Sequence, residues 1–294
     1  MPADTGAGVC PPDSRTRIFG LLGHPVAHSL SPAMHNAAFR ALEMNAVYLA
    51  WDVAPGRVET ALRGLAALGC GGANITVPHK EEAFRSVDRL DESARLAGSV
   101  NTVLFTPDGL AGHNTDAPGF LRAAREELGW EPAGSRVMVC GAGGAGRAIA
   151  LFSARGGAGE VILCDTDRPR ASRVADELRA AAPGTGIRVL GSGAEAAAAA
   201  AACDLIVQAT PLGMKDSDPS PLPPEAFRAG QAAFDLVYVR PETPFMASAR
   251  RAGARVANGL GMLLGQGALA FELWTGCAPP THRMRRALER AVYG

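Results

Sequence analysis

The chain has no excess of charge of either sign. Lysine and arginine together number 29, aspartate and glutamate also number 29, and the formal net charge at pH 7 is zero. A protein without a net field does not draw DNA, anionic lipid or an acidic protein toward it over a distance. The composition therefore excludes nucleic acid and the membrane surface as predicted partners and favours a small-molecule ligand.

The cysteines form no local cluster. The sequence has no C-x-x-C pair, and no histidine stands near a cysteine at the spacing of a metal site. The six are Cys10, Cys70, Cys140, Cys164, Cys203 and Cys277. We expect reduced, buried thiols in a cytoplasmic protein, and no metal site.

Long apolar runs are also missing. Residues 1–17 contain no apolar segment of signal-peptide length, and their Pro, Gly, Asp and Ser content predicts a mobile tail. The longest apolar stretch, 259–273, includes Gln266 and Glu272 and is shorter than the roughly 20 residues of a membrane-crossing helix. Neither secretion nor a membrane span is predicted.

What the sequence does contain is alternation of strands and helices. A chain of 294 residues exceeds the usual single domain, so two domains are expected. The first part predicts strands at 18–22, 46–53 and 72–77 and helices at 31–42 and 58–68. Ser31 is predicted to cap the first helix, with Pro32 in its first turn. This order is typical of an α/β fold with a mostly parallel sheet.

A second series of short apolar strands begins near Arg136. A helix predicted at 119–128 precedes it and marks a domain boundary. The predicted strands are 137–140, 161–164, 205–208 and 233–236.

A glycine-rich turn follows the first strand of this series. Gly141, Gly143 and Gly146 have G-x-G-x-x-G spacing and lead into a helix predicted at 145–153. The first glycine permits a tight bend, the second admits a pyrophosphate against bare backbone, and the third lets the helix pack close to the strand. Free N–H groups at the helix start then bind phosphate. The turn predicts a Rossmann-type dinucleotide site.

Asp165 ends the next strand, about 20 residues beyond the glycines, where an acidic residue binds the adenosine ribose. Capping of the following helix is the alternative. Asp167 adds a second carboxylate, and two carboxylates would repel a ribose 2′-phosphate, so NAD is favoured. Arg168 and Arg170 leave NADP open, because a nearby arginine accommodates the phosphate.

Seven motifs together closely resemble the shikimate dehydrogenase family, in the family's order and across nearly the whole chain from Ile18. They are HSLSP (28–32), NITVPHK (74–80), SVNT (99–102), HNTD (113–116), GAGGAGRA (141–148), DLVYVRPETP (235–244) and NGLGMLLGQGALAF (258–271). The resemblance implies that the hydroxyls of Ser29 and Ser31 bind a substrate carboxylate, and that Asn74 and Thr76 contact ring hydroxyls. On the residues alone, Ser31 is open to the N-cap interpretation.

The resemblance also implies a catalytic pair. Lys80 is the implied catalytic lysine, Asp116 shares with it the hydroxyl being oxidised, and Asn101 completes the polar ring. The residues alone leave alternatives open. A lysine between a strand and a helix is usually a solvated surface residue, and Asn-Thr-Asp is common turn chemistry in which Asp116 caps a helix.

Further positions follow from the later motifs. Gln266 lies on an apolar helix where its amide needs a partner, and the resemblance implies a substrate hydroxyl. Tyr238 and Met262 are similar to family positions near the substrate and the nicotinamide, although such residues are often core. The expected cofactor positions are Gly141, Ala142, Gly143, Gly144, Ala145, Gly146, Asp165, Thr210, Gly259 and Met262. His79 is not expected to act as acid or base, because the family uses the lysine that follows it.

By this resemblance, residues 1–117 with 259–294 form a discontinuous α/β substrate domain, and 118–258 form the Rossmann domain. The implied reaction is reversible hydride transfer between NAD(P) and the 3-position of shikimate, giving 3-dehydroshikimate in aromatic amino acid biosynthesis. An NAD-dependent quinate/shikimate dehydrogenase is the alternative, as is use of amino-substituted shikimate analogues, and a non-catalytic pathway sensor is a third. Retention of Ser29 and Ser31 favours shikimate. A monomer or a homodimer is expected.

Overall fold

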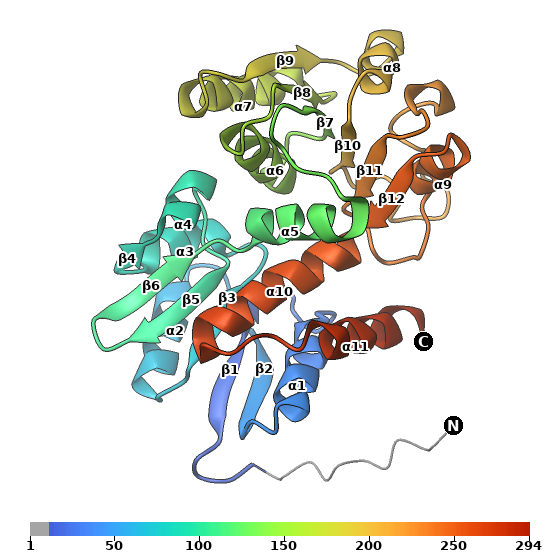
Figure 1. The fold of residues 1–294 in the computed structure, drawn as a ribbon. Helices are drawn as coiled ribbons and strands as arrows, with labels where there is room; N and C mark the ends of the chain where they lie inside the picture. The colour runs from blue at the N-terminus through green and yellow to red at the C-terminus, as the bar shows by residue number, and fades with distance from the viewer. Residues whose placement is uncertain (1–11) are drawn as a thin grey trace, which may run out of the picture. The chain divides into compact units, whose positions relative to one another are not determined.

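The computed structural model describes residues 12–294, which fold into two compact units (Figure 1). Unit 1 contains the chain up to Thr115 together with Gly267–Val292 and Gly294, and unit 2 contains Asp116–Gln266 and Tyr293. The unit boundaries therefore fall two residues before the predicted 117/118 division and eight residues after the predicted 258/259 division. Cys10 and most of the predicted mobile tail lie outside the described residues.

Unit 1 is built on one six-stranded sheet of order β2-β1-β3-β5-β6-β4. Its strands are β1 (Arg17–Gly23), β2 (Ala46–Asp52), β3 (Gly72–Ile75), β4 (Arg89–Leu90), β5 (Thr102–Thr106) and β6 (Gly109–His113). β1 pairs in parallel with β2 and β3, and β4 with β6, whereas β5 is antiparallel to β3 and β6. The mostly parallel sheet is confirmed.

The helices of unit 1 bury an aromatic and aliphatic core. They are α1 (Ser31–Ala41), α2 (Val58–Ala67), α3 (Lys80–Ser86), α4 (Glu92–Ala97), the later part of α10 (Gly259–Thr275) and nearly all of α11 (Thr281–Tyr293). The predicted N-cap at Ser31 is wrong. Leu30 is the N-cap residue and Ser31 is the first helical residue, while the hydroxyl of Ser29 accepts a hydrogen bond from the Ser31 backbone N–H at 3.3 Å.

Unit 2 is a Rossmann-type domain with an all-parallel sheet of order β12-β11-β10-β7-β8-β9. Its strands are β7 (Arg136–Cys140), β8 (Glu160–Cys164), β9 (Gly186–Leu190), β10 (Leu205–Gln208), β11 (Ala232–Asp235) and β12 (Arg255–Asn258). The order reverses between β7 and β10, and ligands of such sheets bind beyond the strand ends at this point. The two-domain α/β prediction is confirmed.

The helices of unit 2 cover both faces of that sheet. They are α5 (Asp116–Leu128), α6 (Gly144–Arg155), α7 (Arg168–Ala181), α8 (Ala194–Ala201), α9 (Pro244–Arg251), the first part of α10 and a short 3-10 turn at Pro224–Ala226. α8 and α9 pack on the sheet face that carries Met138, Cys140, Ile162 and Cys164. Because side chains alternate along a strand, the residues that precede and follow these four in the sequence point to the other face of the sheet.

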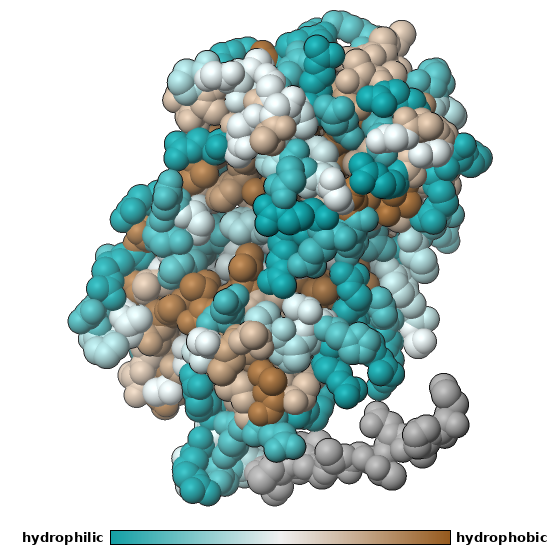
Figure 2. All heavy atoms as spheres, viewed as in Figure 1, coloured by the Kyte–Doolittle hydropathy of each residue, from teal (hydrophilic) through white to brown (hydrophobic). Residues whose placement is uncertain are grey.

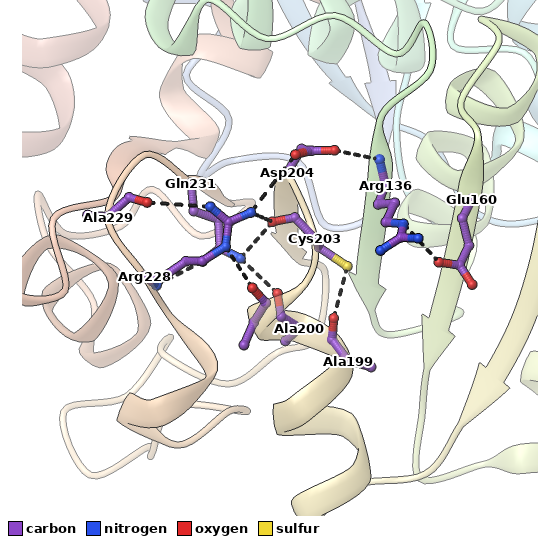
Figure 3. Close-up of polar contacts among 10 residues, drawn as sticks. Arg136, Glu160, Ala199, Ala200, Cys203, Asp204, Arg228, Ala229 and Gln231 are labelled. Atoms are coloured by element: carbon purple, nitrogen blue, oxygen red, sulfur yellow. Dashed lines mark hydrogen bonds and ion pairs between the residues drawn. The ribbon is translucent and has the colours of Figure 1, made fainter.

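Backbone carbonyls at the C-terminal end of α8 accept hydrogen bonds from side chains of another segment (Figure 3). Gln231 is fully buried and donates to the carbonyls of Ala200 and Cys203 at 2.7 and 2.9 Å. Arg228 donates to the carbonyls of Ala201 and Cys203 at 2.7 and 3.1 Å. These bonds satisfy carbonyls that have no partner within the helix. The alanine-rich segment is thereby fixed in place.

On the face shown in Figure 2, hydrophilic side chains predominate and apolar residues occur in small groups. Four of the described cysteines are buried free thiols, but Cys277 is exposed, so the expectation that every thiol is buried is wrong at this position. Cys277 follows Gly276 in the connection between α10 and α11. Among residues 12–294, no helix has both the length and the apolar character that a bilayer crossing requires.

Candidate functional site

The glycine-rich turn of unit 2 gives two of its three glycines, Gly141 and Gly146, a steric reason. Gly141 has φ +101°, a conformation that other residues rarely adopt. A Cβ at Gly146 would lie 1.9 Å from the Gly141 carbonyl oxygen, so α6 could not approach the turn with any other residue there. At Gly143, a Cβ would meet no atom within 4 Å. Gly143 is the N-cap of α6 and faces open space, as a site for a phosphate group needs.

A cavity of about 670 Å³ lies beside this turn. Gly141, Gly143, Asp165 and Thr210, four of the predicted cofactor residues, line it. Cys140, Cys164 and Arg170 line it as well. Its size is within the range of ligand pockets, and it lies where the carboxyl ends of β7, β8 and β10 meet. The turn and the acidic strand end therefore belong to one concave site.

Asp165 occupies this site as a buried carboxylate, 6% exposed. It accepts hydrogen bonds from the backbone N–H groups of Ala142 at 2.6 Å and Asp167 at 2.8 Å, and Arg170 Nη2 lies 2.8 and 2.9 Å from its two oxygens. Burial opposes its ionisation, but the hydrogen bonds from Ala142, Asp167 and Arg170 outweigh burial and lower its pKa. The carboxylate is held ionised.

The alternative for Asp165, capping of the following helix, is wrong. The N-cap of α7 is Asp167, whose side chain accepts from the backbone N–H of Arg170 at 3.0 Å. Asp165 instead joins the glycine-rich turn to the start of α7, because it bonds Ala142 on one side and Arg170 on the other.

Thr210 is held by a residue that the sequence patterns did not single out. Gln208, fully buried at the end of β10, accepts from both the backbone N–H and the hydroxyl of Thr210 at 2.8 Å. Its amide donates to the carbonyls of Thr210 and Leu212. An amide that ends an otherwise apolar strand is the signal that could have found it, since a buried amide needs partners.

In unit 1, three predicted substrate residues share one buried polar network. The hydroxyl of Tyr48 on β2 donates to Asn74 Oδ1 on β3 at 2.7 Å, and Ser31 hydrogen-bonds the same tyrosine. Asn74 Nδ2 donates to the carbonyl of Asn101 at 3.1 Å and to Thr102 Oγ1 at 3.0 Å. Ser31, Asn74 and Asn101 are thus connected through Tyr48, a residue that no motif had indicated.

The network continues past Asn101. Asn101 Nδ2 donates to Thr115 Oγ1 at 3.0 Å, and its Oδ1 accepts from the Thr115 backbone N–H at 2.8 Å. These bonds tie the SVNT segment to the HNTD segment. The two motifs therefore form one structural assembly.

His35 packs against Tyr48, one of the residues of this network. Its ring stacks on that of Tyr48, with ring centroids 4.4 Å apart and planes 12° from parallel. The ring centroid of Trp274 lies 5.5 Å from that of His35. His35 is fully buried, and neither ring nitrogen has a hydrogen-bond partner among the described residues. Burial lowers its pKa to about 3, so the ring is neutral.

Lys80 is the first residue of α3, and Thr76 lies in the segment before it. The Lys80 carbonyl accepts from the Val100 backbone N–H at 3.0 Å, which places the start of α3 beside the SVNT motif. His79 is buried and its Nε2 lies 2.7 Å from the carbonyl oxygen of Val53. That contact gives His79 a structural role.

The remaining predicted residues belong to unit 2. Asp116 is the first residue of α5, and burial raises the pKa of Tyr238. Gln266 Nε2 donates to the Leu263 carbonyl at 3.0 Å, so the amide has a partner within its own helix. Gly259, the first residue of α10, is required by packing, because a Cβ there would lie 2.0 Å from the Leu236 carbonyl oxygen. Met262 is in the first turn of α10 and Ala145 in that of α6.

No cluster of three or more metal-ligating side chains occurs in the part of the chain that the structure describes. The site therefore consists of hydroxyls, amides, backbone N–H groups and a few charged side chains. Such groups can bind a polyhydroxylated carboxylate in unit 1 and a phosphate-bearing nucleotide in unit 2.

Comparison with known proteins identifies the relatives of this chain. Residues 21–103 match the shikimate dehydrogenase substrate binding domain, and residues 259–289 match the shikimate 5′-dehydrogenase C-terminal domain. The chain is 49% identical over 279 residues to shikimate dehydrogenase (NADP(+)) of Moorella thermoacetica, covering 94% of each chain. It is 46% identical to the Methanopyrus kandleri protein of the same name, covering 94% of this chain and 96% of the relative.

Solved structures agree with the sequence relatives. Shikimate 5-dehydrogenase from Listeria monocytogenes, in complex with shikimate and NAD, has a TM-score of 0.90 and 31% identity, with 96% of this chain and 100% of that chain covered. Quinate dehydrogenase from Corynebacterium glutamicum, in complex with NAD, has a TM-score of 0.86 and 31% identity, with 94% and 99% covered.

Proposed function

The chain belongs to the shikimate dehydrogenase family, and we propose that it transfers a hydride reversibly between shikimate and a nicotinamide dinucleotide. Oxidation at the 3-position gives 3-dehydroshikimate. The observation that carries this proposal is the connected network of Ser31, Tyr48, Asn74 and Asn101, in the segment that matches the family's substrate binding domain. The mutual hydrogen bonds of these buried amides and hydroxyls hold them in fixed positions, which supports their use by a polar ligand.

Unit 1 takes the substrate. The hydroxyls of Ser29 and Ser31 are neutral donors for the carboxylate, and Asn74, Thr76 and Asn101 face the ring hydroxyls. Asn74 and Asn101 each have hydrogen bonds that fix their amide planes, so their remaining bonding positions are preorganised. Gln266 and Tyr238 extend the substrate-binding set.

Lys80 and Asp116 carry the proton. Oxidation of an alcohol removes a hydride from carbon and a proton from oxygen, and the nicotinamide, when bound, supplies the hydride acceptor. A lysine can take the hydroxyl proton in one direction and return it in the other, and a carboxylate beside it stabilises its charged form. Few other groups in the predicted set can move a proton near neutral pH.

Unit 2 takes the dinucleotide. The backbone of residues 141–146 binds the pyrophosphate, and Asp165 binds the adenosine ribose. Thr210 lines the cavity from the loop that follows β10. Gly259 and Met262, at the start of α10, are the residues assigned to the nicotinamide in this proposal. The cavity, the positive φ of Gly141 and the open side of Gly143 support this assignment.

Within the nicotinamide dinucleotides we propose a preference for NAD. Two carboxylates, Asp165 and Asp167, stand where a ribose 2′-phosphate would bind, and Arg170, the cation best placed to bind that phosphate, already contacts both. The relatives from Moorella and Methanopyrus are named for NADP, so the preference rests on this local charge balance alone.

A second candidate is a quinate/shikimate dehydrogenase, which the similarity to the NAD complex of quinate dehydrogenase favours. One experiment separates the possibilities. Initial rates of the purified protein are measured with shikimate or quinate, each with NAD or NADP, at equal concentrations. We expect the highest kcat/KM with shikimate and NAD. A clear preference for NADP would overturn the cofactor proposal, and a preference for quinate would overturn the substrate proposal. If neither NAD nor NADP is reduced with either substrate, the proposed function itself is wrong.

A further inference from the structure

Two cysteines stand side by side in the wall of the unit 2 cavity. Cys140 ends β7 and Cys164 ends β8, and they are register partners in the parallel pair formed by these strands. Adjacent strands lie about 4.8 Å apart, and disulfide-linked Cα atoms are usually about 4.4–6.8 Å apart. The backbone therefore already places the two residues at a separation that a disulfide can span.

The two side chains also point the same way. Both belong to the core on the sheet face covered by α8 and α9, and their thiols hydrogen-bond to one another. Cys164 Sγ donates to the Gly191 carbonyl at 3.4 Å, so within the pair Cys140 is the donor. That bond lowers the pKa of Cys164 and holds Cys140 protonated. Cys164 is thus the thiol that ionises first.

Access to the cavity distinguishes this pair from the other described thiols, because Cys70 and Cys203 do not line it and the exposed Cys277 lies between α10 and α11. Both Cys140 and Cys164 line the cavity, and Cys164 is the more exposed of the two, at 8% against 2%. Cys203 is fully buried, and its Sγ donates to the Ala199 carbonyl at 3.3 Å (Figure 3). Its neighbour Asp204 bonds Arg136 at the opposite end of β7 from Cys140. Cys203 is therefore a buried thiol remote from the cavity mouth.

We propose that Cys140 and Cys164 form an oxidisable dithiol in the cofactor cavity, which a hydroperoxide converts to a disulfide and which a bound dinucleotide shields. Shielding rests on the proposed function, because it requires the adenosine end of the dinucleotide to occupy this cavity. The dithiol itself rests only on the register, the contact between the thiols and their access.

The chemistry balances in two steps. The Cys164 thiolate attacks one oxygen of hydrogen peroxide, breaking the O–O bond, and gives a sulfenic acid and hydroxide, which takes up the proton that Cys164 released. The Cys140 sulfur then attacks the sulfenic sulfur, forming the S–S bond, and the sulfenic hydroxyl leaves as water with the Cys140 proton. Two thiols lose two electrons in all, and one peroxide becomes two molecules of water.

Oxidation should weaken dinucleotide binding. Gly141 follows Cys140 and Asp165 follows Cys164, and the Gly141 N–H donates to the Cys164 carbonyl at 2.8 Å. An S–S bond of about 2 Å draws the side chains closer than two hydrogen-bonded thiols lie, so it reshapes the wall beside the ribose and phosphate positions. By linkage, a ligand that binds the reduced form more tightly disfavours oxidation by the same factor.

The test is peroxide treatment of the reduced full-length protein, followed by blocking of free thiols and peptide mapping under non-reducing conditions. We expect a Cys140–Cys164 disulfide that dithiothreitol reverses. With NAD or NADP at about ten times its Kd, only about a tenth of the protein is unliganded, so the rate should fall about tenfold. Equilibrium binding should show weaker affinity for the same dinucleotide after oxidation.

Matched variants make the result specific. Cys164→Ser should abolish the disulfide, whereas Cys203→Ser and Cys277→Ser should form it at the wild-type rate. If Cys164 is oxidised no faster than buried Cys70, or if Cys140 and Cys164 never cross-link, the dithiol proposal is wrong. If the disulfide forms but neither dinucleotide slows it, shielding is wrong. Binding of NAD and NADP to the reduced protein is then measured. If a dinucleotide binds without slowing oxidation, it does not occupy this cavity, and if neither binds, the proposed function is wrong.

Discussion

Arg170 Nη2 lies 2.8 Å from one carboxylate oxygen of Asp165 and 2.9 Å from the other. This contact links the start of α7 to the residue expected to recognise the adenosine ribose. The same contact occupies Arg170, the cation that would otherwise be available to a 2′-phosphate. Arg170 also pairs with Asp167 at 3.8 Å. The proposed preference for NAD therefore depends on what Arg170 is bound to.

Asp165→Asn should shift cofactor preference toward NADP. The substitution removes one negative charge next to the 2′-phosphate position and releases Arg170 from its strongest partner. We expect the ratio of kcat/KM for NADP to that for NAD to rise by on the order of tenfold or more, since each 1.4 kcal/mol of removed repulsion corresponds to a factor of ten. Steady-state kinetics with both cofactors measure it.

Asp176→Asn is the matched control. Asp176 lies on α7, the helix that carries Arg170, and pairs with Arg179 at 2.8 Å, but its side chain is 77% exposed. The same change of charge there should leave the ratio as in the wild type. An unchanged ratio in Asp165→Asn would show that Asp165 does not discriminate between the cofactors.

Lys80→Ala should lower kcat by roughly 10² or more while changing shikimate affinity little, because general acid–base catalysis contributes rate rather than binding. Lys80→Arg should be nearly as impaired, since a guanidinium keeps its charge but does not give up its proton near neutral pH. Turnover and substrate binding are measured separately, by initial rates and by equilibrium titration.

Lys215→Ala is the natural control, because Lys215 is the only other lysine in the sequence. It lies in the segment after β10 and should behave as wild type. Near wild-type turnover of Lys80→Ala would remove Lys80 from the mechanism.

The sequence predicted the centre of the unit 2 sheet better than its edges. β7 and β8 bury four of their five residues, and such continuous apolar runs are recognisable. β9 and β12 were not predicted, because they lie at the two edges of the unit 2 sheet and each has only one buried residue among exposed and half-buried ones. A short, half-exposed strand resembles a loop in sequence.

Site residues were predictable where a motif carried them and not where only the fold did. The glycine turn and Asp165 follow from spacing along the chain. Tyr48 and Gln208 do not, because each acts through contacts with residues on another strand or in a loop. The N-cap interpretation of Ser31 failed for a local reason, since Leu30 precedes it in a helical conformation and Ser31 already belongs to the helix.

Tyr48→Phe should impair substrate binding and stability together. The change removes the donor to Asn74 Oδ1 at 2.7 Å and leaves a buried acceptor unpaired. We expect a loss of about 1–3 kcal/mol in unfolding free energy and a higher KM for shikimate, because the Asn74 amide loses one of the three hydrogen bonds that hold its orientation. Denaturant unfolding and steady-state kinetics measure the two effects.

Tyr293→Phe serves as its control. Tyr293 is an exposed residue at the end of α11, and its hydroxyl bonds Asn258 at 3.0 Å. The same loss of a hydroxyl at an exposed position should cost little stability. An unchanged KM in Tyr48→Phe would mean that Tyr48 does not position Asn74 for the substrate.

His35 should make the protein lose stability as the pH falls. Its pKa is lowered by burial to about 3, whereas an unfolded histidine titrates near 6.5. A depressed pKa gives stability that is fully present above the unfolded value and is lost below it, because the unfolded state takes up the proton first. Between pH 6.5 and 5 the loss from this one group approaches about 2 kcal/mol. Urea unfolding at pH 7 and pH 5 measures it.

His35→Phe isolates the contribution of the imidazole. A phenyl ring retains stacking on Tyr48 but does not titrate, so the difference in stability between wild type and variant should shrink or reverse as the pH falls from 7 to 5. Asp235 changes stability in the opposite direction, because burial raises its pKa to about 6, and its contribution is present at low pH and lost as the pH rises through about 6. Asp235 is the same in both proteins and cancels from the difference. A wild-type slope retained in His35→Phe would contradict the assignment.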